Sequence, residues 1–157
     1  MPAEDARTAQ DATGAADGAS LPLAATWPAS VRQWEHVITR WAGQYAMDPD
    51  LLAAVVLVES GGNPEAVSHS GACGLMQVMA RDTTAAYGRM FADRPTCAEL
   101  TDPERNIGWA VHYLATLYER NGHDWREALR RYGPSDRGYQ YADLVLAHYQ
   151  KHAEATP

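Results

Sequence analysis

Apolar residues recur at helical spacing in several separate stretches of the chain. Trp125 to Tyr132 and Tyr139 to His152 each have an apolar face, and no strong alternating strand pattern accompanies them. Two further stripes, with steps of three or four residues, run through Val31, Trp34, Ile38, Trp41 and Tyr45 and through Ile107, Val111, Leu114 and Leu117. Such stripes are typical of helices that pack one face on a common core. We therefore predict a mainly α domain without internal repeats.

Start and stop signals divide these stretches into helices. The Asp-Pro pairs at 48–49 and 102–103 each combine an N-cap residue with proline at the first helical position. The first pair should open a helix that Gly61-Gly62 ends, and the second a helix that Gly122 ends. Ser30 with Gln33 fits a capping box for the first helix.

Less regular structure is expected between the second and third long helices. The stretch from Ser68 to Gly74 carries glycines and should be a loop, with a short helical piece starting at Leu75. Residues 88–101 show no clear period and are predicted to be irregular.

The N-terminal composition differs from the remainder of the chain. Residues 1–26 are rich in Ala, Asp, Gly, Thr and Ser and contain no aromatic residue, so they cannot bury enough surface to offset the entropy of ordering. We predict a disordered tail or tether over residues 1–26 and one domain over residues 27–157, with order beginning near Trp27.

Charge and hydropathy exclude several classes of partner. The 13 Lys and Arg against 20 Asp and Glu give a net charge of −7, which argues against nucleic acid because phosphate neutralisation needs clustered cations. No stretch is long and apolar enough to span a membrane, and we expect a monomer. The N-terminus shows no basic segment followed by an apolar one, as would also hold for a chain beginning at a mature terminus.

Glu59 is the most unusual residue of the pattern. It follows the segment Ala53 to Val58, the most apolar in the chain, whereas glutamate is rarely buried without a partner. Burial and the negative pole at the C-terminal end of a helix both disfavour the charged carboxylate and raise its pKa. A carboxylic acid kept protonated near neutral pH is what glycoside cleavage requires. A solvated residue at a helix end is the plainer alternative.

Four motifs in order resemble one family. They are Glu59-Ser60, then Gly71-Ala72-Cys73-Gly74-Leu75-Met76-Gln77, then Asp102-Pro103 with Asn106-Ile107, then Ala128 to Tyr132. Over roughly residues 30–150 this series resembles the soluble lytic transglycosylase domain, which is related to goose-type lysozyme. The resemblance implies a lysozyme-like helical fold with a glycan-binding groove.

The resemblance also implies a reaction. Glu59 matches the catalytic acid/base that cleaves the β-1,4 bond between N-acetylmuramic acid and N-acetylglucosamine, with no cofactor. The same carboxyl group would then help the muramyl C6 hydroxyl attack C1, which gives a 1,6-anhydro sugar and consumes no water. The substrate would be peptidoglycan glycan strands, so the protein is expected to act outside the cytoplasm, in the periplasm, cell wall or medium, with a phage origin left open.

The remaining motif residues receive roles by the same resemblance. Tyr132 matches the tyrosine that hydrogen-bonds the catalytic glutamate. Groove or substrate contacts are implied for Ser60, Gly74, Met76, Gln77 and Tyr141. Several have a plainer reading: Met76 and Tyr141 as core, Ser60 as a residue that caps or solvates the helix end, and Gly74 as a position that needs backbone freedom. For Asn106 the family match favours a structural hydrogen bond.

One motif departs from the family pattern. The family usually has Ala-Tyr-Asn, but here Gly133 follows Tyr132 in place of asparagine. The change removes one expected substrate contact. Tyr139 and Tyr141 follow after a short connection, and Tyr141 is the better match to a late groove tyrosine.

Other chemistry finds little support. The downstream carboxylates Glu65, Asp82, Asp93 and Glu99 match no motif and are predicted to be surface charges, which leaves a one-carboxylate mechanism. The six histidines form no metal-binding pair, so no metal is expected. A hydrolytic muramidase and a non-catalytic peptidoglycan-binding module remain as alternatives.

Cys73 and Cys97 are either two buried thiols or one disulfide. Action on peptidoglycan places the protein in an oxidising compartment, where disulfides persist. On that ground we predict a bridge that pins the irregular stretch beside the groove.

Overall fold

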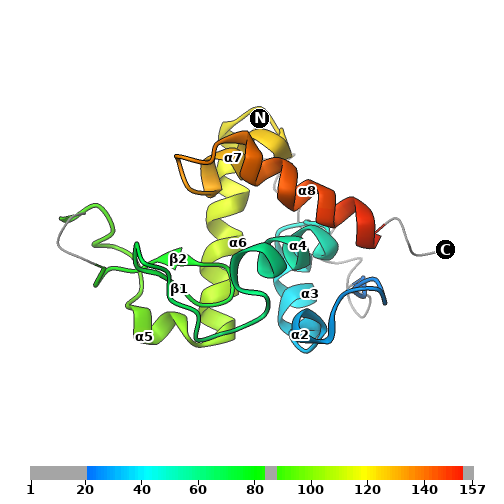
Figure 1. The fold of residues 1–157 in the computed structure, drawn as a ribbon, viewed down its shortest axis with the longest axis horizontal. Coiled ribbons are helices and arrows are strands. Elements are labelled where there is room, and N and C mark those ends of the chain that lie inside the picture. Colours follow the sequence, from blue (N-terminus) through cyan, green and yellow to red (C-terminus); the bar gives the residue numbers. More distant parts are fainter. Residues whose placement is uncertain (1–20, 84–87, 154–157) are drawn as a thin grey trace, which may run out of the picture.

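The computed structural model describes residues 21–83 and 88–153, which form a helical domain around one long helix (Figure 1). In chain order the elements are α2 Ala29–Arg32, α3 Glu35–Gln44, α4 Pro49–Ser60, β1 Ala72–Cys73, β2 Val78–Met79, α5 Cys97–Leu100, α6 Pro103–Arg120, α7 Trp125–Tyr132 and α8 Tyr139–Ala153. The predicted mainly α class is confirmed.

Helix α4 is the centre of the core. Its residues from Leu51 to Val56 are all buried, because α2, α3 and α8 pack around it. Helix α6 packs against α3 on one side and α7 on another, and α7 also contacts α8. In Figure 1, α2 to α4 lie on one side of α6, and the β1–β2 hairpin with α5 lies on the other. The part of the chain between α4 and α6 is therefore made mostly of loops, with the short hairpin and α5 as its regular elements.

The start and stop signals hold where a side chain caps the helix. Asp48 and Asp102 each accept a hydrogen bond from the backbone two residues later, ahead of Pro49 and Pro103. Gly61 ends α4 with φ of 63°, in the left-handed region that glycine tolerates. Asp124 caps α7 in the same way.

Three local predictions need correction. Ser30 and Gln33 form no capping box: α2 begins after Pro28 without a side-chain cap, and a second helix, α3, begins after Trp34. The segment from Leu75 is not helical but the turn of an antiparallel hairpin that pairs Ala72 with Met79. Within the irregular stretch, Thr96 and Glu99 form a true capping box that starts the short helix α5.

Packing begins earlier than Trp27. Leu23 and Ala24 are buried, and their backbone N–H groups donate to Glu35 and Asp50 at 3.1 and 3.0 Å. The Thr26 hydroxyl donates to the His152 carbonyl at 3.0 Å, which ties this segment to the end of α8. The predicted tail is therefore too long by at least the residues from Leu23 to Thr26. Hydrogen bonds to acceptors on the domain stabilise this segment although its composition is poor in core-forming residues. Residues 1–20 lie outside the described residues.

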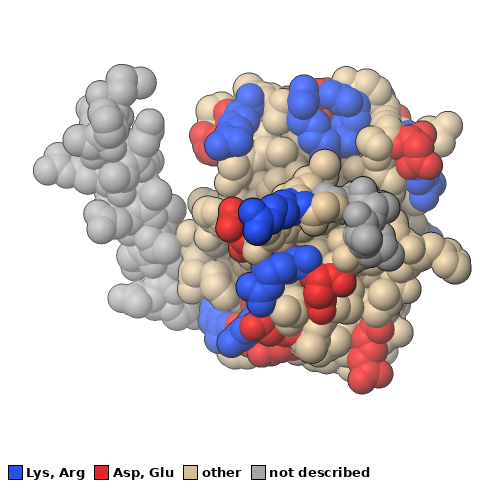
Figure 2. Space-filling model, turned by 90° about the vertical axis from the view of Figure 1, so that its left-hand side faces the viewer, with Lys and Arg blue, Asp and Glu red and all other residues tan. Residues whose placement is uncertain are grey.

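No helix within residues 21–83 and 88–153 is both long and apolar enough to cross a bilayer. On the face shown in Figure 2, basic and acidic side chains are interspersed among uncharged surface.

Candidate active site

Glu59 sits in the last turn of α4, where the buried helix meets a surface groove. Ser60 and Gly61 follow it, and the left-handed Gly61 turns the chain away so that the carboxyl group reaches the groove. The groove has a volume of about 560 Å³. Its lining comes from the loop before β1, the hairpin, the segment before α5 and the turn after α7: Glu59, Ser68, Ser70, Ala72, Gln77, Met79, Phe91, Tyr132, Gly133, Pro134, Ser135 and Asp136.

Burial raises the pKa of Glu59 from 4.5 to about 8. Two weaker influences, the Tyr141 hydroxyl and the positive charge of Arg137, lower this pKa but do not reverse the shift. Its place in the last turn of α4 adds the unfavourable negative pole of the helix. Glu59 is therefore a protonated acid at neutral pH, able to donate a proton inside the groove.

Tyr141 is the tyrosine beneath Glu59. Its ring is buried on α8, and its hydroxyl lowers the pKa of the Glu59 carboxyl. The Tyr141 hydroxyl is buried, and its oxygen forms no hydrogen bond with another of the described residues. Burial and the adjacent Glu59 raise the pKa of Tyr141 well above its usual value, so the phenol stays neutral.

Tyr141 also explains the unusual Gly133. A Cβ atom at position 133 would overlap the Tyr141 ring, so any larger residue would displace it. The φ of −73° at Gly133 is ordinary, which means that space and not backbone freedom demands glycine. The Tyr141 ring thus occupies the space into which a side chain at position 133 would extend.

Tyr132 does not make the predicted hydrogen bond to Glu59. Its hydroxyl donates to the Met76 carbonyl oxygen at 2.7 Å, which joins the end of α7 to the hairpin turn. It still lines the groove, and burial, together with the nearby charge of Glu59, raises its pKa. The predicted hydrogen bond therefore needs correction, because the hydroxyl braces the groove wall, whereas a catalytic role for Tyr132 stays a prediction. Tyr141 is a second tyrosine beside Glu59.

Met76 and Gly74 lie behind the groove wall. The Met76 side chain is fully buried in the core and does not line the groove, contrary to prediction. Gly74 has φ of +80°, and a Cβ there would overlap the Asn106 amide and the Leu100 carbonyl oxygen. The predicted need for glycine is real, but the close approach is to α5 and α6 and not to a glycan.

Asn106 explains that approach. Its side-chain oxygen accepts from the Met76 N–H at 2.8 Å, and its amide donates to the Cys73 and Leu100 carbonyls at 2.8 and 3.0 Å. The structural hydrogen bond expected for Asn106 is confirmed, and its side chain forms three such bonds. One fully buried side chain on α6 thereby holds both the hairpin and α5.

Ser60 and Gln77 fix the hairpin from the other side. The Ser60 hydroxyl donates to the Leu75 carbonyl at 2.7 Å and accepts from the Gly62 N–H, so it joins α4 to the hairpin and does not line the groove. Gln77 lines the groove with a left-handed backbone, φ 52°, and its amide donates to the Ala66 and Gly74 carbonyls at 3.0 Å each. Its contact with a glycan stays a prediction.

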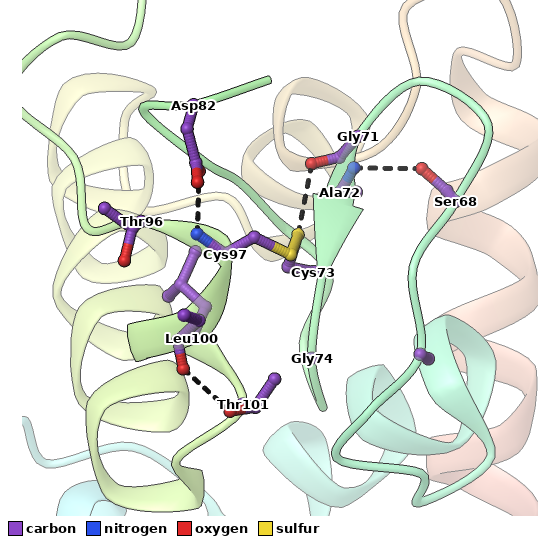
Figure 3. Close-up of a disulfide and its surroundings, with 12 residues drawn as sticks. Ser68, Gly71, Ala72, Cys73, Gly74, Asp82, Thr96, Cys97, Leu100 and Thr101 are labelled. Atoms are coloured by element: carbon purple, nitrogen blue, oxygen red, sulfur yellow. Dashed lines mark hydrogen bonds between the residues drawn. A yellow bond between two sulfur atoms is a disulfide. The ribbon is translucent and has the colours of Figure 1, made fainter. Parts of the chain in front are cut away.

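The predicted disulfide is confirmed. Cys73 of β1 is bonded to Cys97 at the start of α5, with 5.6 Å between the Cα atoms (Figure 3). Asp82 accepts from the Cys97 N–H at 2.8 Å beside the bridge. The bridge therefore fixes the hairpin wall of the groove to the segment leading into α6.

Sequence reasoning missed several groove residues. Phe91, Ser68, Ser70 and Asp136 all line the groove but belong to none of the motifs. Phe91 is the single phenylalanine of the chain and lies in the stretch predicted to be irregular, where an aromatic residue was a usable signal. Asp136 is an exposed carboxylate in the turn before α8, and nothing in its neighbourhood distinguished it from a surface charge.

Comparison with known proteins identifies relatives of this chain. Residues 36–135 match the family model of the transglycosylase SLT domain. Endo-type membrane-bound lytic murein transglycosylase A from Salmonella paratyphi B, and that from Salmonella paratyphi A, are each 42% identical to this chain over 87 residues. That alignment covers 54% of this chain and 43% of each relative, so the chain spans less than half of their length.

A solved structure shares the fold. The 70 kDa soluble lytic transglycosylase from Escherichia coli superposes with a TM-score of 0.57 at 21% identity, over 80% of this chain and 27% of that one. The family model covers well over half of the present chain, including α4 with Glu59, the hairpin and α7. The chain therefore belongs to the transglycosylase SLT domain family.

Proposed function

We propose that this protein is a lytic transglycosylase that cleaves the β-1,4 bond between N-acetylmuramic acid and N-acetylglucosamine in peptidoglycan, with Glu59 as its acid and then its base. The observation that carries the proposal is the half-buried Glu59 carboxyl group, whose pKa burial raises to about 8 and which lines a groove. Membership of the SLT family supplies the substrate class. The relatives named above are murein transglycosylases by their names.

Glu59 would act twice in one turnover. Its proton moves to the glycosidic oxygen as the bond to C1 of the muramyl residue breaks, and positive charge develops at C1. The resulting carboxylate stabilises that charge and then accepts the proton of the C6 hydroxyl as this oxygen bonds to C1. Glu59 is protonated again at the end, the product is a 1,6-anhydro sugar, and no water enters.

The surroundings of Glu59 support this double role. Burial favours the protonated acid before cleavage, while Tyr141 and the charge of Arg137 favour the carboxylate after it. A pKa pulled in both directions suits a group that must release and recover a proton in the same site.

Hydrolysis of the same bond is the second candidate, because Asp136 also lines the groove. In a muramidase, a second carboxylate activates water across the scissile bond. The exposure of Asp136 on the groove rim is less suited to that task than the enclosed position of Glu59.

Digestion of purified peptidoglycan, followed by mass spectrometry of the released muropeptides, separates these activities. Transglycosylation gives anhydro products, lighter by one water than the reducing products of hydrolysis. Asp136→Asn should retain anhydro products, whereas Glu59→Gln should release none. Reducing products that vanish in Asp136→Asn would establish the muramidase, and binding of peptidoglycan without turnover by the wild type would establish a non-catalytic module.

Action outside the cytoplasm is part of the proposal. The Cys73–Cys97 disulfide supports an oxidising compartment.

A further inference from the structure

Arg94 is a half-buried cation held against the groove by aromatic rings. Its guanidinium carbon lies 4.4 Å from the centre of the Phe91 ring, 4.6 Å from that of Trp109 and 5.3 Å from that of Tyr113. One of its Nη atoms is 3.4 Å from the Met79 carbonyl oxygen. Phe91 and Met79 line the groove, so this packing holds the positive charge of Arg94 directly beside the groove wall.

The other ring-stacked arginines in the described part of the chain differ from Arg94 in one respect. Arg126 and Arg130 both stack on Tyr139, and Arg126 pairs with Asp143 while Arg130 pairs with Glu127. Arg40 stacks on Trp41 and pairs with Glu104. Arg94 takes part in no ion pair with a carboxylate of residues 21–83 or 88–153.

The electrostatics of Arg94 agree with this absence. Burial lowers the pKa of its guanidinium, and the groups that oppose this shift are the tyrosines Tyr113 and Tyr132. A guanidinium nevertheless keeps its proton in proteins, so Arg94 remains a half-buried charge that no carboxylate of the described residues pairs with. Such an arrangement is typical of a site that a bound ligand completes.

The proposed substrate limits what that ligand can be, and this step rests on the proposed function. The N-acetylated sugars of the glycan strand are neutral, so the strand itself offers no anion. Carboxylates occur on the lactyl substituent of the muramyl residue, either as the bare lactyl group or along the peptide stem attached to it. Within such a strand, a cation beside the groove can therefore form an ion pair only with this substituent.

We propose that Arg94 binds a carboxylate carried by the lactyl or lactyl-peptide substituent of a muramyl residue bound in the groove. This ion pair favours strands that carry the anionic substituent, and it positions the muramyl residue relative to Glu59. Arg94 is thus a specificity-determining residue that takes no part in the proton transfers.

Three substrates test the proposal. They are glycan strands with peptide stems, strands stripped of stems by an amidase so that the lactyl carboxylate is bare, and stripped strands whose lactyl carboxylate is methyl-esterified. Arg94→Gln should raise KM by about tenfold on the substrates whose carboxylate it binds and leave KM unchanged on the esterified strand. A deficit on stem-bearing strands alone identifies a stem carboxylate, and one on stripped strands identifies the lactyl group.

Arg89→Gln is the matched control, because it removes the same charge from an exposed position in the same segment. It should leave KM unchanged on all three substrates. If Arg94→Gln changes KM by the same factor on all three, including the esterified strand, Arg94 only supports the aromatic packing and the proposal is overturned.

A second measurement needs only the wild-type protein and so survives a failure of Arg94→Gln to fold. Phenylglyoxal modifies accessible arginines, and peptide mapping locates each modified one. Stem-bearing or stripped fragments should protect Arg94 and leave Arg89 reactive, while esterified fragments should protect neither. Equal protection by charged and esterified fragments would contradict the inference. Loss of wild-type cleavage on every substrate would instead refute the proposed function and leave the protection result standing.

Discussion

Two glutamates beside α8 have opposite electrostatic fates. Glu127, at the surface of α7, accepts hydrogen bonds from Arg130 and from the Tyr139 hydroxyl, and these lower its pKa from 4.5 to about 2. Glu59, in the groove, has Tyr141 as its polar neighbour and a pKa raised to about 8. Tyr139 and Tyr141 are only two residues apart, but they lie on different faces of α8, one exposed and one buried.

The comparison shows that a carboxyl group is specified by its surroundings and not by its residue type. Around Glu127, paired arginines and water keep the charge and make it a structural anchor. Around Glu59, burial outweighs the weaker influences of Tyr141 and Arg137, which keeps the side chain a proton donor. Removing each surrounding in turn tests this contrast.

The largest expected effect is the loss of catalysis in Glu59→Gln. The amide keeps the size of the side chain but cannot donate the proton, so cleavage of peptidoglycan should fall by at least about a thousandfold. Glu127→Gln is the matched control and should cleave within about threefold of wild type. The measurement is the release of soluble muropeptides, and a Glu59→Gln rate within about tenfold of wild type would refute the assignment.

The pH dependence of stability should also separate the two sites. Because the pKa of Glu59 is raised from 4.5 to about 8 by folding, the folded protein binds the proton more tightly, and ionisation opposes folding. Its contribution to stability is complete at low pH and declines between those two values, by up to about 1.4 kcal/mol per pH unit.

Glu59→Gln should remove this decline, so the variant gains stability relative to wild type as pH rises from about 5 to about 8. Glu127→Gln should show no such gain, since the pKa of Glu127 is lowered on folding. Urea denaturation at a series of pH values measures both differences. A constant difference between Glu59→Gln and wild type would show that Glu59 is not desolvated in solution.

The disulfide should matter for both stability and the acid. A bridge across 24 residues of sequence is worth about 3 kcal/mol in the chain-entropy model, so reduction should lower Tm by several degrees. It also holds the hairpin wall beside Glu59, so a loosened wall should admit water and move the pKa of Glu59 toward 4.5. Thermal melts with and without reductant, together with pH–rate profiles, test both effects, and identical profiles would restrict the bridge to stability.

The smallest expected effect concerns the two tyrosines. The Tyr141 hydroxyl lowers the pKa of Glu59, so Tyr141→Phe should raise that pKa further and move the alkaline limb of kcat/KM to higher pH. We also expect kcat to fall by about tenfold, because the ionised form of Glu59 loses a neighbouring dipole. Tyr139→Phe should change neither quantity. Equal pH–rate profiles for Tyr141→Phe and Tyr139→Phe would show that the two faces of α8 do not differ in their effect on Glu59.

How far the sequence led depends on the range of each interaction. The Asp-Pro helix starts and the Gly61 stop were predicted correctly, because the bonds that satisfy a helix end come from residues within a few positions. The capping box predicted at Ser30 was wrong. Ser30 lies inside the short helix α2, which ends before Trp34, so Ser30 is not at the N-terminus of the longer helix α3. The helix predicted from Leu75 was wrong for a different reason. The segment is a hairpin turn, and the hydrogen bond that holds it comes from Asn106, some 30 residues away in sequence.

By itself the sequence determined the helical class, the anomalous Glu59 at the end of an apolar helix, and the partnership of Cys73 with Cys97 once an oxidising compartment was inferred. The tertiary structure alone decided that the Tyr132 hydroxyl bonds the hairpin while Tyr141 packs beside Glu59, and that Met76 and Gly74 lie behind the wall. It also decided that Arg94 lies beside the groove without an ion pair to a carboxylate of the described residues. The physical reason is that helix formation and capping are local, whereas burial, pKa and ion pairing depend on segments that only folding brings together.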